Sequence, residues 1–481
     1  MFSFYSLALP TAILIVVAII SSLRRRTLPF PPGPPCIPLI GNYLSLPARQ
    51  PWITYAEWSK TFCSDVISLQ AFGRLSIIVN TKEAAKELLE CRSAKYSDRP
   101  FPVMTEIMGW AWATSLMPYS NAWRVRRRLL HETFHTTAAL TYRPHQRAEV
   151  HKMLQRLRAD PQRFALNLLG FASMAASIAM TIAYGVMDPR ESDRFLHLAE
   201  ASVSMFSNAV FPGAAVVNAL PFLRHLPAWL PGMGFKPYAQ KCSRLAMDMR
   251  DLPWEFFKKG MADKYYMKDD GEQAMKDACA VTYAGTVSAL STSVLALFLH
   301  PAVQRRAQQE IDRVVGRQRL PAFEDRDGLP YIEAVYREIL RWKPVTPLSV
   351  FRAVLEDDVY EGHFIPKGTE VFANVWAMTH DPAEYPDPEA FIPERFLQPE
   401  GTLNGDDMRI VFGFGRRFCS GQHLADATLW MTIVSILAVF NLDPAKDEKG
   451  ENIVVKAEYT DGMIRCVLKN MLREFSTRGS F

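Results

Sequence analysis

The fold and chemistry of this chain are indicated most clearly by one stretch of ten residues, Phe412-Gly413-Phe414-Gly415-Arg416-Arg417-Phe418-Cys419-Ser420-Gly421. Their glycines allow the backbone to approach a large flat ligand closely. The apolar residues that follow, from Leu424 to Leu437, predict a helix that begins just after Cys419. A cysteine before a helix N-terminus has its thiolate stabilised by the helix dipole and by free amides, and the nearby arginines add to this effect. A thiolate held in this way can ligate haem iron.

The same stretch resembles the Phe-x-x-Gly-x-Arg-x-Cys-x-Gly signature of the cytochrome P-450 superfamily. Every fixed position is present, namely Phe412, Gly415, Arg417, Cys419 and Gly421. A match over ten residues is highly specific. The resemblance implies haem b as the cofactor, with Cys419 as the axial ligand of the iron and Arg417 as a partner of a haem propionate. Ser420 stands where many relatives have proline, a departure that affects the stiffness of the loop more than ligation.

Three residues upstream of the cysteine support this resemblance. Glu338-Ile339-Leu340-Arg341 is similar to the Glu-x-x-Arg of the family's K helix, and residues three apart share one helix face. Arg395, in Pro393-Glu394-Arg395-Phe396, matches the third member of the same structural network. Glu-x-x-Arg alone is a common surface pair worth less than ~1 kcal/mol. Here Glu338 and Arg341 are followed by Arg395 and then by the cysteine, and this order makes the match specific. The resemblance implies that these three residues support the fold and seat the haem and are not catalysts.

Further residues resemble the family's propionate donors. Trp123-Arg124-Val125-Arg126-Arg127 is similar to the C-helix Trp-x-x-x-Arg, whose spacing puts Trp123 and Arg127 on one face. Arg352 occupies the place where related fungal sequences have a histidine, and we expect it to replace that donor. Arg124, Arg126 and Arg128 have two interpretations that the sequence leaves open. They form either a solvated basic face or a docking face for an acidic electron donor.

Length and composition exclude several classes of protein. The chain has 481 residues, 49% of them hydrophobic and 22% charged, which excludes disorder and coiled coil as whole-chain descriptions. Its net charge of +5 is too small to suggest a nucleic-acid partner. The seven cysteines are odd in number and widely spaced, so they do not make a disulfide scaffold. We expect one catalytic domain, mainly α with a small β part, as in the cytochrome P-450 fold.

The N-terminus predicts a membrane anchor. Phe2 to Leu23 contains no charged side chain and would span about 33 Å as a helix, enough for a hydrocarbon core of ~30 Å. Arg24, Arg25 and Arg26 follow and stay cytosolic by the positive-inside rule. The expected organisation is a single transmembrane anchor at 2–23, a basic and proline-rich hinge at 24–38, the haem-thiolate domain at 39–468 and an unassigned tail at 469–481. The resemblance implies the endoplasmic reticulum membrane, with the catalytic domain in the cytosol.

The oxygen-activating helix departs from the family pattern. The family usually has Ala/Gly-Gly-x-Asp/Glu-Thr there, an acid and an alcohol that relay protons. This chain reads Tyr283-Ala284-Gly285-Thr286-Val287, so about four residues that include the acid are missing. Thr286 is a candidate for the remaining catalytic alcohol, but no Asp or Glu lies between Asp277 and Glu310.

The resemblance therefore implies a monooxygenase that inserts one atom of O2 into a lipophilic secondary metabolite or xenobiotic. Electrons would come from NADPH through a separate cytochrome P-450 reductase, with cytochrome b5 as a further donor, because the chain has no GxGxxG dinucleotide loop of its own. Two alternatives stay open. One is a haem-thiolate isomerase, dehydratase or peroxide-dependent enzyme that does not activate O2, and the other is a degenerate, inactive haem binder. We expect substrate contacts from about Phe101 to Met117, Ser202 to Phe211, Thr286 and Pro347 to Phe351.

Overall fold

The computed structural model describes residues 28–100, 102–160, 169–185, 189–210, 216–260, 269–281, 287–444, 459–464 and 473–478. Helices make up most of these ranges and the strands are short, as the sequence predicts. The predicted membrane anchor at 2–23, the first part of the hinge at 24–27 and Thr286 lie outside the described residues.

The elements have the following bounds. The α-helices are α2 (Pro51–Thr61), α3 (Lys82–Lys86), α4 (Val103–Ile107), α5 (Asn121–Phe134), α6 (Thr136–Thr141), α7 (Arg143–Ala159), α9 (Leu169–Tyr184), α10 (Pro189–Val210), α11 (Val216–Ala219), α12 (Phe235–Gly260), α13 (Asp269–Val281), α14 (Val287–Leu299), α15 (Pro301–Val314), α16 (Pro330–Trp342), α17 (Val375–Thr379) and α18 (Gln422–Val439). The shorter helical turns are η1 (Tyr43–Ser45), η2 (Glu87–Cys91), η3 (Pro221–His225), η4 (Phe323–Gly328), η5 (Pro393–Phe396), η6 (Arg409–Phe412) and η7 (Gly415–Arg417). The strands are β1 (Val66–Ala71), β2 (Arg74–Val79), β3 (Arg352–Ala353), β4 (Asp358–Tyr360), β5 (His363–Ile365), β6 (Glu370–Ala373), β7 (Phe440–Pro444) and β8 (Arg473–Thr477).

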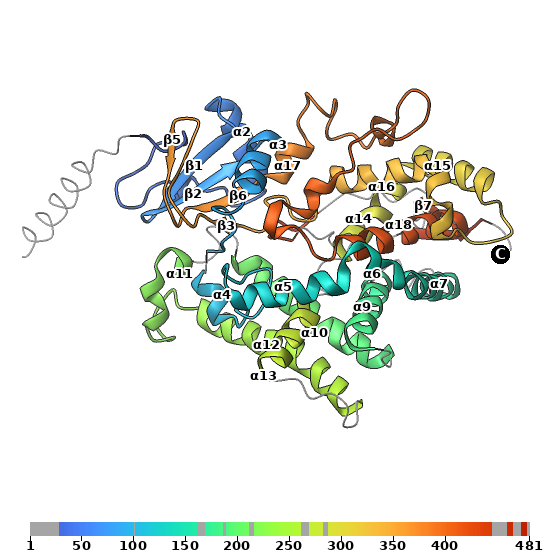
Figure 1. Ribbon diagram of the computed structural model, residues 1–481, viewed down its shortest axis with the longest axis horizontal. Coiled ribbons are helices and arrows are strands. Elements are labelled where there is room, and N and C mark those ends of the chain that lie inside the picture. Colours follow the sequence, from blue (N-terminus) through green and yellow to red (C-terminus); the bar gives the residue numbers. More distant parts are fainter. Residues whose placement is uncertain are drawn as a thin grey trace, which may run out of the picture.

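The largest sheet lies at one end of the molecule, beside α2, α3 and α17 (Figure 1). Its strand order is β1-β2-β6-β3, with β2 and β6 parallel and the other pairs antiparallel. The β1–β2 hairpin turns at Phe72 and Gly73, whose φ angles of 49° and 78° suit a two-residue hairpin turn. Thr81 caps the next helix, because its hydroxyl accepts from the Ala84 amide. The sequence signals for these two features are short apolar runs on either side of Gly73 and a threonine directly before a helical apolar pattern.

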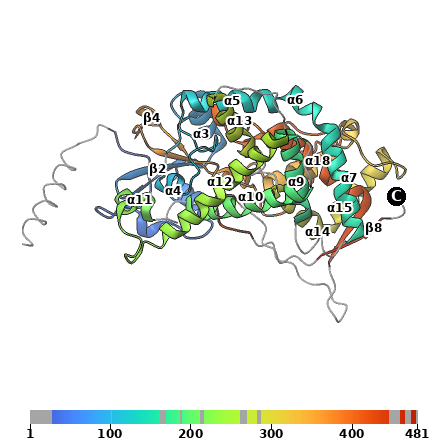
Figure 2. The same cartoon turned by 90° about the horizontal axis from the view of Figure 1, so that it is seen from below.

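The helices form the rest of the body, and α10 packs along α12 in both views (Figures 1 and 2). The core of this part surrounds α18, whose residues from Ala427 to Val439 are all buried. A helix that is apolar on every side belongs in a core or a membrane. Among the described residues α18 is the one helix long and apolar enough to cross a membrane, and its burial identifies it as a core helix. It extends directly from the cysteine loop into the centre of the protein.

Two details differ from the sequence-based expectations. Val345 to Val354 reads as a strand, but only Arg352–Ala353 pairs in the sheet. Pro347 has no amide hydrogen, and Ser349 adopts a positive φ of 54°, so the preceding backbone turns instead of extending. The tail at 469–481, unassigned from sequence, contains β8, which pairs with β7 at the end of α18. Arg478 continues this contact by donating to Asp312 at 2.9 Å.

Candidate functional site

The cysteine loop is shaped by its glycines and by one backbone hydrogen bond. Gly413 and Gly415 have φ angles of 94° and 48°, a region that favours glycine. The Cys419 amide donates to the Phe412 carbonyl at 2.9 Å, which closes the loop around the thiol. A Cβ atom on Gly415 would lie 2.3 Å from the Leu89 carbonyl oxygen. The glycines of the motif therefore let the loop pack directly on the backbone of η2.

Replacing Gly415 with alanine is expected to destabilise the protein by about 1–3 kcal/mol, because it combines backbone strain with this close contact. Gly421→Ala is the matched control, since Gly421 has a φ of −89° and a Cβ atom there would have no neighbouring atom within 4 Å. Denaturant unfolding of both variants checks the prediction. Equal unfolding midpoints for the two variants would show that the loop does not need glycine at position 415.

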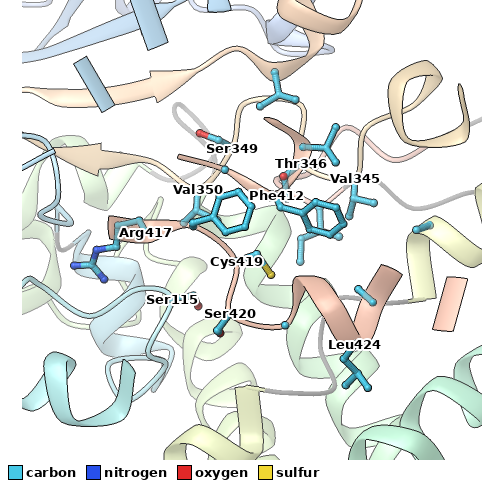
Figure 3. A pocket seen from close by; sticks show the side chains of 18 of the residues that line it. Ser115, Val345, Thr346, Ser349, Val350, Phe412, Arg417, Cys419, Ser420 and Leu424 are labelled. Atoms are coloured by element: carbon cyan, nitrogen blue, oxygen red, sulfur yellow. The ribbon is translucent and has the colours of Figure 1, made fainter. Parts of the chain in front are cut away.

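A cavity of about 360 Å³ lies between this loop, α5, α14, α16 and the start of α18. Figure 3 shows the Cys419 sulfur inside it, with Phe412 nearby and Leu424 on the first turns of α18. Thr346, Ser349 and Val350 of the segment between α16 and β3 form another side of it. The remaining walls are largely apolar, with Leu130, Phe134, Ala289, Ile339, Leu340, Val375, Leu429 and Ile464 among the lining residues.

Cys419 lies deep in the protein, and its exposed surface faces this cavity. Burial raises the pKa of the Cys419 thiol, while the Gly421 amide and the Arg127 guanidinium act to lower it. A bound metal ion deprotonates a coordinating thiol even where burial disfavours the thiolate. The site is thus suited to a thiol that becomes a thiolate when it binds a metal centre.

Four arginines line the same cavity, namely Arg99, Arg127, Arg352 and Arg417. No carboxylate among the described residues lies within 4 Å of any of them, and none of the described lining residues is Asp or Glu. Burial, reinforced by repulsion between the guanidiniums of Arg352 and Arg417, lowers the pKa of Arg417 to about 9. Burial likewise lowers the pKa of Arg352 to about 10. Among the described residues, the cluster therefore has no carboxylate in direct contact, and Asp98 and Glu90 act on it only from a distance.

Backbone carbonyls orient the arginines without neutralising them. Arg417 donates to the carbonyls of Ser97 and Met117 at 2.8 and 2.9 Å, and its Nη1 is buried with no hydrogen-bond partner. The Arg417 guanidinium lies 4.2 Å from the centre of the Trp123 ring. Trp123 and Arg127 both line the cavity, so the spacing of four residues does place them on one face. A buried unpaired N–H is costly, which indicates that an acceptor belongs here.

Arg352 and Arg99 complete the cluster from the sheet side. Arg352 donates to the Phe414 carbonyl at 2.6 Å, so it supports the cysteine loop as well as lining the cavity. Arg99 donates to the carbonyls of Ser115 and Val350 at 2.9 and 2.6 Å. Arg99 is a site residue that sequence reasoning missed, because nothing in its local sequence distinguishes it from a surface arginine.

The donor set fits a haem. It combines one thiol, a cluster of cations with no Asp or Glu among the described lining residues, an orphaned Arg417 N–H and apolar walls. These features match an iron centre, two propionates and a flat macrocycle. Cys419 would hold the iron, and Trp123, Arg127, Arg352 and Arg417, together with Arg99, would hold the propionate edge.

The predicted Glu338–Arg341–Arg395 network forms beneath the site. Glu338 and Arg341 are both fully buried, and Arg341 Nε and Nη2 donate to the two Glu338 oxygens at 2.6 and 2.8 Å. The other N–H groups of Arg341 donate to the carbonyls of Thr379, Pro388 and Ala390. Arg395 Nε reaches Glu338 at 3.3 Å. Every donor of Arg341 is used, so the network ties α16 to the segment before the cysteine loop.

The basic face of α5 is divided by the structure. Arg126 donates to the buried carboxylate of Asp277 on α13 at 2.9 and 2.7 Å, so it is neither solvated nor available for docking. Arg124 and Arg128 are exposed, and both interpretations stay open for them. Burial raises the pKa of Asp277, against the opposing effect of Arg126. Asp277 is thus committed to α5 and does not line the cavity.

The residues predicted to contact substrate lie in different places. The cavity is lined by Thr114, Ser115, Ser349 and Val350 among them, and by none of the described residues from Ser202 to Val210. Glu310 accepts from the amides of Tyr331 and Ile332, so it too is engaged elsewhere. Two further lining residues, Thr292 and Ile464, were not expected from the sequence.

The chain is similar to known proteins over nearly its whole length. The family model described as Cytochrome P450 matches residues 31–243 and 266–461. Cytochrome P450 monooxygenase COX2 of Coprinopsis cinerea is 38% identical over 469 residues, which cover 92% of this chain and 88% of that protein. Cytochrome P450 monooxygenase claR of Ampulloclitocybe clavipes is 37% identical, with 92% and 85% covered. Tryptamine 4-monooxygenase of Psilocybe cyanescens is 35% identical, with 92% of each chain covered.

Proposed function

The chain belongs to the cytochrome P450 family, and from that premise we propose that it is a haem-thiolate monooxygenase of the fungal, membrane-anchored type. Its substrate is a lipophilic small molecule, a secondary metabolite or a xenobiotic. When bound, the haem supplies the redox chemistry by which one atom of O2 enters the substrate and the other leaves as water. The observation that carries the proposal is the Cys419 thiol in one cavity with four arginines and no described acid.

Each residue has a defined part in this proposal. Cys419 ligates the iron, and Arg417, Trp123, Arg127 and Arg352 donate to the propionates. The loop that presents the thiol is shaped by Phe412, Gly415 and Gly421. The position of this loop relative to α16 is held by Glu338, Arg341 and Arg395. Thr286 is the catalytic alcohol in this proposal, on the strength of the sequence pattern alone. The apolar walls exclude water and orient the substrate, which suits a lipophilic molecule.

Electrons reach the site from NADPH through a separate reductase, with cytochrome b5 as a further donor. The exposed Arg124 and Arg128 of α5 support this part of the proposal, since they lie on the helix whose other face lines the cavity. Basic side chains there speed the encounter with an acidic protein. No nucleic-acid partner is proposed.

The exposed apolar residues support a membrane location, which we propose is the endoplasmic reticulum with the catalytic domain in the cytosol. Leu39 and Leu44 precede the first sheet, and Phe222 and Trp229 follow α11; all four are more than half exposed. Residues 28–56 and 201–247 contain no Asp or Glu. Exposed apolar and aromatic side chains on stretches of chain that contain no acidic residue suit a lipid headgroup region. Recovery of the full chain in the aqueous fraction after flotation with vesicles would contradict this location.

The proposed reaction is tested with purified protein, a cytochrome P-450 reductase, NADPH and ¹⁸O2. Lipophilic compounds that shift the haem absorption band serve as substrate candidates. We expect one ¹⁸O atom per product molecule and product formation that requires NADPH. Formation of product from organic peroxide alone, with none from NADPH and O2, would contradict the monooxygenase and favour the second candidate.

That second candidate is a haem-thiolate isomerase, dehydratase or peroxide-dependent enzyme that does not activate O2. It is favoured by one observation, the lack of Asp and Glu among the described residues that line the cavity. Such reactions do not need an acid and alcohol relay. A degenerate haem binder would form no product in either assay.

A further inference from the structure

Arg352 joins two segments of backbone on the sheet side of the cavity. Its Nη2 donates to the Phe414 carbonyl of the cysteine loop at 2.6 Å, and its Nη1 donates to the Leu89 carbonyl of η2 at 3.4 Å. The residue is 4% exposed and belongs to β3, which pairs with β6 in the largest sheet. The Arg352 guanidinium therefore links the sheet, η2 and the cysteine loop.

The two carbonyls that accept from Arg352 lie on either side of one tight contact. Gly415 follows Phe414 directly, and a Cβ atom on Gly415 would lie 2.3 Å from the Leu89 carbonyl oxygen. The oxygen that Gly415 packs against is thus the same oxygen that accepts from Arg352 Nη1. The hydrogen bond of the Cys419 amide closes the loop at its ends, whereas Arg352 fastens the middle of the loop to η2.

The choice of arginine at this position matters for these contacts. Arg352 occupies the place where related fungal sequences have a histidine. A neutral imidazole has a single N–H donor, whereas a guanidinium presents five in a rigid planar fork. One N–H group does not serve two carbonyls, but the fork of Arg352 serves both and still lines the cavity. Arginine thus adds a contact with the cysteine loop that binding of a propionate does not require.

We propose that Arg352 is a positioning residue, which holds the cysteine loop on η2 and thereby fixes the Cys419 thiol at the wall of the cavity. This role differs from the propionate contact that the resemblance implies, because it acts on the backbone of the protein and needs no anion from a cofactor. Replacing a residue that orients a metal ligand typically lowers metal affinity by roughly 10–100-fold. The inference rests on the haem-thiolate part of the proposed function.

Arg352→His tests the role in the full chain, with haem b and, separately, with the dimethyl ester of haem b, whose propionates carry no charge. We expect the red-shifted carbon monoxide band to be lost in mild denaturant at least about tenfold faster than in the wild type, with either cofactor. The iron–sulfur stretching frequency in the resonance Raman spectrum should also change, which a general loss of stability would not cause. Arg352→Lys keeps the charge and loses the fork, so it should lie between the two.

Hydrogen–deuterium exchange of the amides at 412–419 gives a second readout that needs no modified cofactor. Arg352→His should raise exchange in this loop, and Arg352→Lys gives the same comparison if the histidine variant retains no haem. Arg319→His is the matched control, because Arg319 is half exposed and donates to Asp325 instead of to the loop. It should leave the exchange of the loop, the Raman frequency and the lifetime of the carbon monoxide band unchanged.

Two results would overturn the positioning role. One is an effect of Arg352→His that disappears with the dimethyl ester, since that would assign Arg352 to the propionates alone. The other is exchange of the 412–419 amides in the Arg352 variants equal to that of the Arg319 control. Failure of the proposed function is a separate result, because the wild-type protein with haem b bound would then lack the red-shifted band, and the inference would fall with it.

Discussion

Replacing Cys419 with alanine is expected to abolish NADPH-dependent oxygenation, with a loss of at least about a hundredfold. Removing a residue that only supports a metal ligand typically lowers activity by up to about a hundredfold. Cys419 is expected to be the ligand itself, so its removal should cost at least as much. No other described cysteine lines the cavity, so no thiol can replace it. The amount of bound haem should also decrease, because only the arginines, through the propionates, would still hold it.

The measurements are product formation and haem content of the purified variant. Cys63→Ala is the matched control, because Cys63 is exposed and does not line the cavity. It should keep full activity. Oxygenation by Cys419→Ala at the rate of the control would show that the chemistry does not depend on this thiol.

Replacing Glu338 with alanine is expected to lower the free energy of unfolding by about 3–5 kcal/mol. The Arg341 guanidinium would remain fully buried without its carboxylate, and Arg395 would lose the same partner. The total stability of a domain is about 5–15 kcal/mol, so such a loss is a large part of it. Denaturant unfolding gives the change as a shift of the midpoint at unchanged slope.

A matched comparison separates this buried network from ordinary ion pairs. The pair of Arg319 and Asp325 has a half-exposed guanidinium, so Arg319→Ala should cost less than about 1 kcal/mol. Glu338→Gln keeps the shape of the side chain and should cost less than Glu338→Ala, which keeps the test informative if the alanine variant does not fold. An unfolding midpoint of Glu338→Gln equal to that of Arg319→Ala would contradict a stabilising role for the charge.

The sequence predicts the parts of the site that are local. The cysteine loop is one contiguous motif, and Trp123 and Arg127 share a face because helical geometry puts residues four apart together. Glu338 and Arg341 meet for the same reason. Their arrangement in the structure agrees with these expectations.

The parts that sequence reasoning missed depend on contacts between distant segments. Arg99 becomes a cavity residue because it bonds to the Val350 carbonyl, 251 residues away. Thr292 is an ordinary helical threonine until Tyr459 approaches it. The pairing of β7 with β8 likewise joins the end of α18 to the tail. No periodicity or capping pattern encodes such contacts.

The division of the basic face of α5 has the same origin. Arg124, Arg126 and Arg128 are equivalent as sequence, and only the position of Asp277 on α13 separates them. A buried carboxylate takes Arg126 and leaves the other two at the surface. A charge run in one helix therefore does not define a docking face until the neighbouring helix is placed.

Cys419 is expected to bind haem iron as a thiolate in the cavity with the four arginines. The most direct measurement is the absorption spectrum of the reduced, full-length protein with carbon monoxide. Thiolate ligation predicts the red-shifted band of haem-thiolate proteins, and Cys419→Ala should lose it while Cys63→Ala keeps it. A spectrum without that band in freshly purified wild-type protein with haem bound, or a band that persists in Cys419→Ala, would contradict the claim.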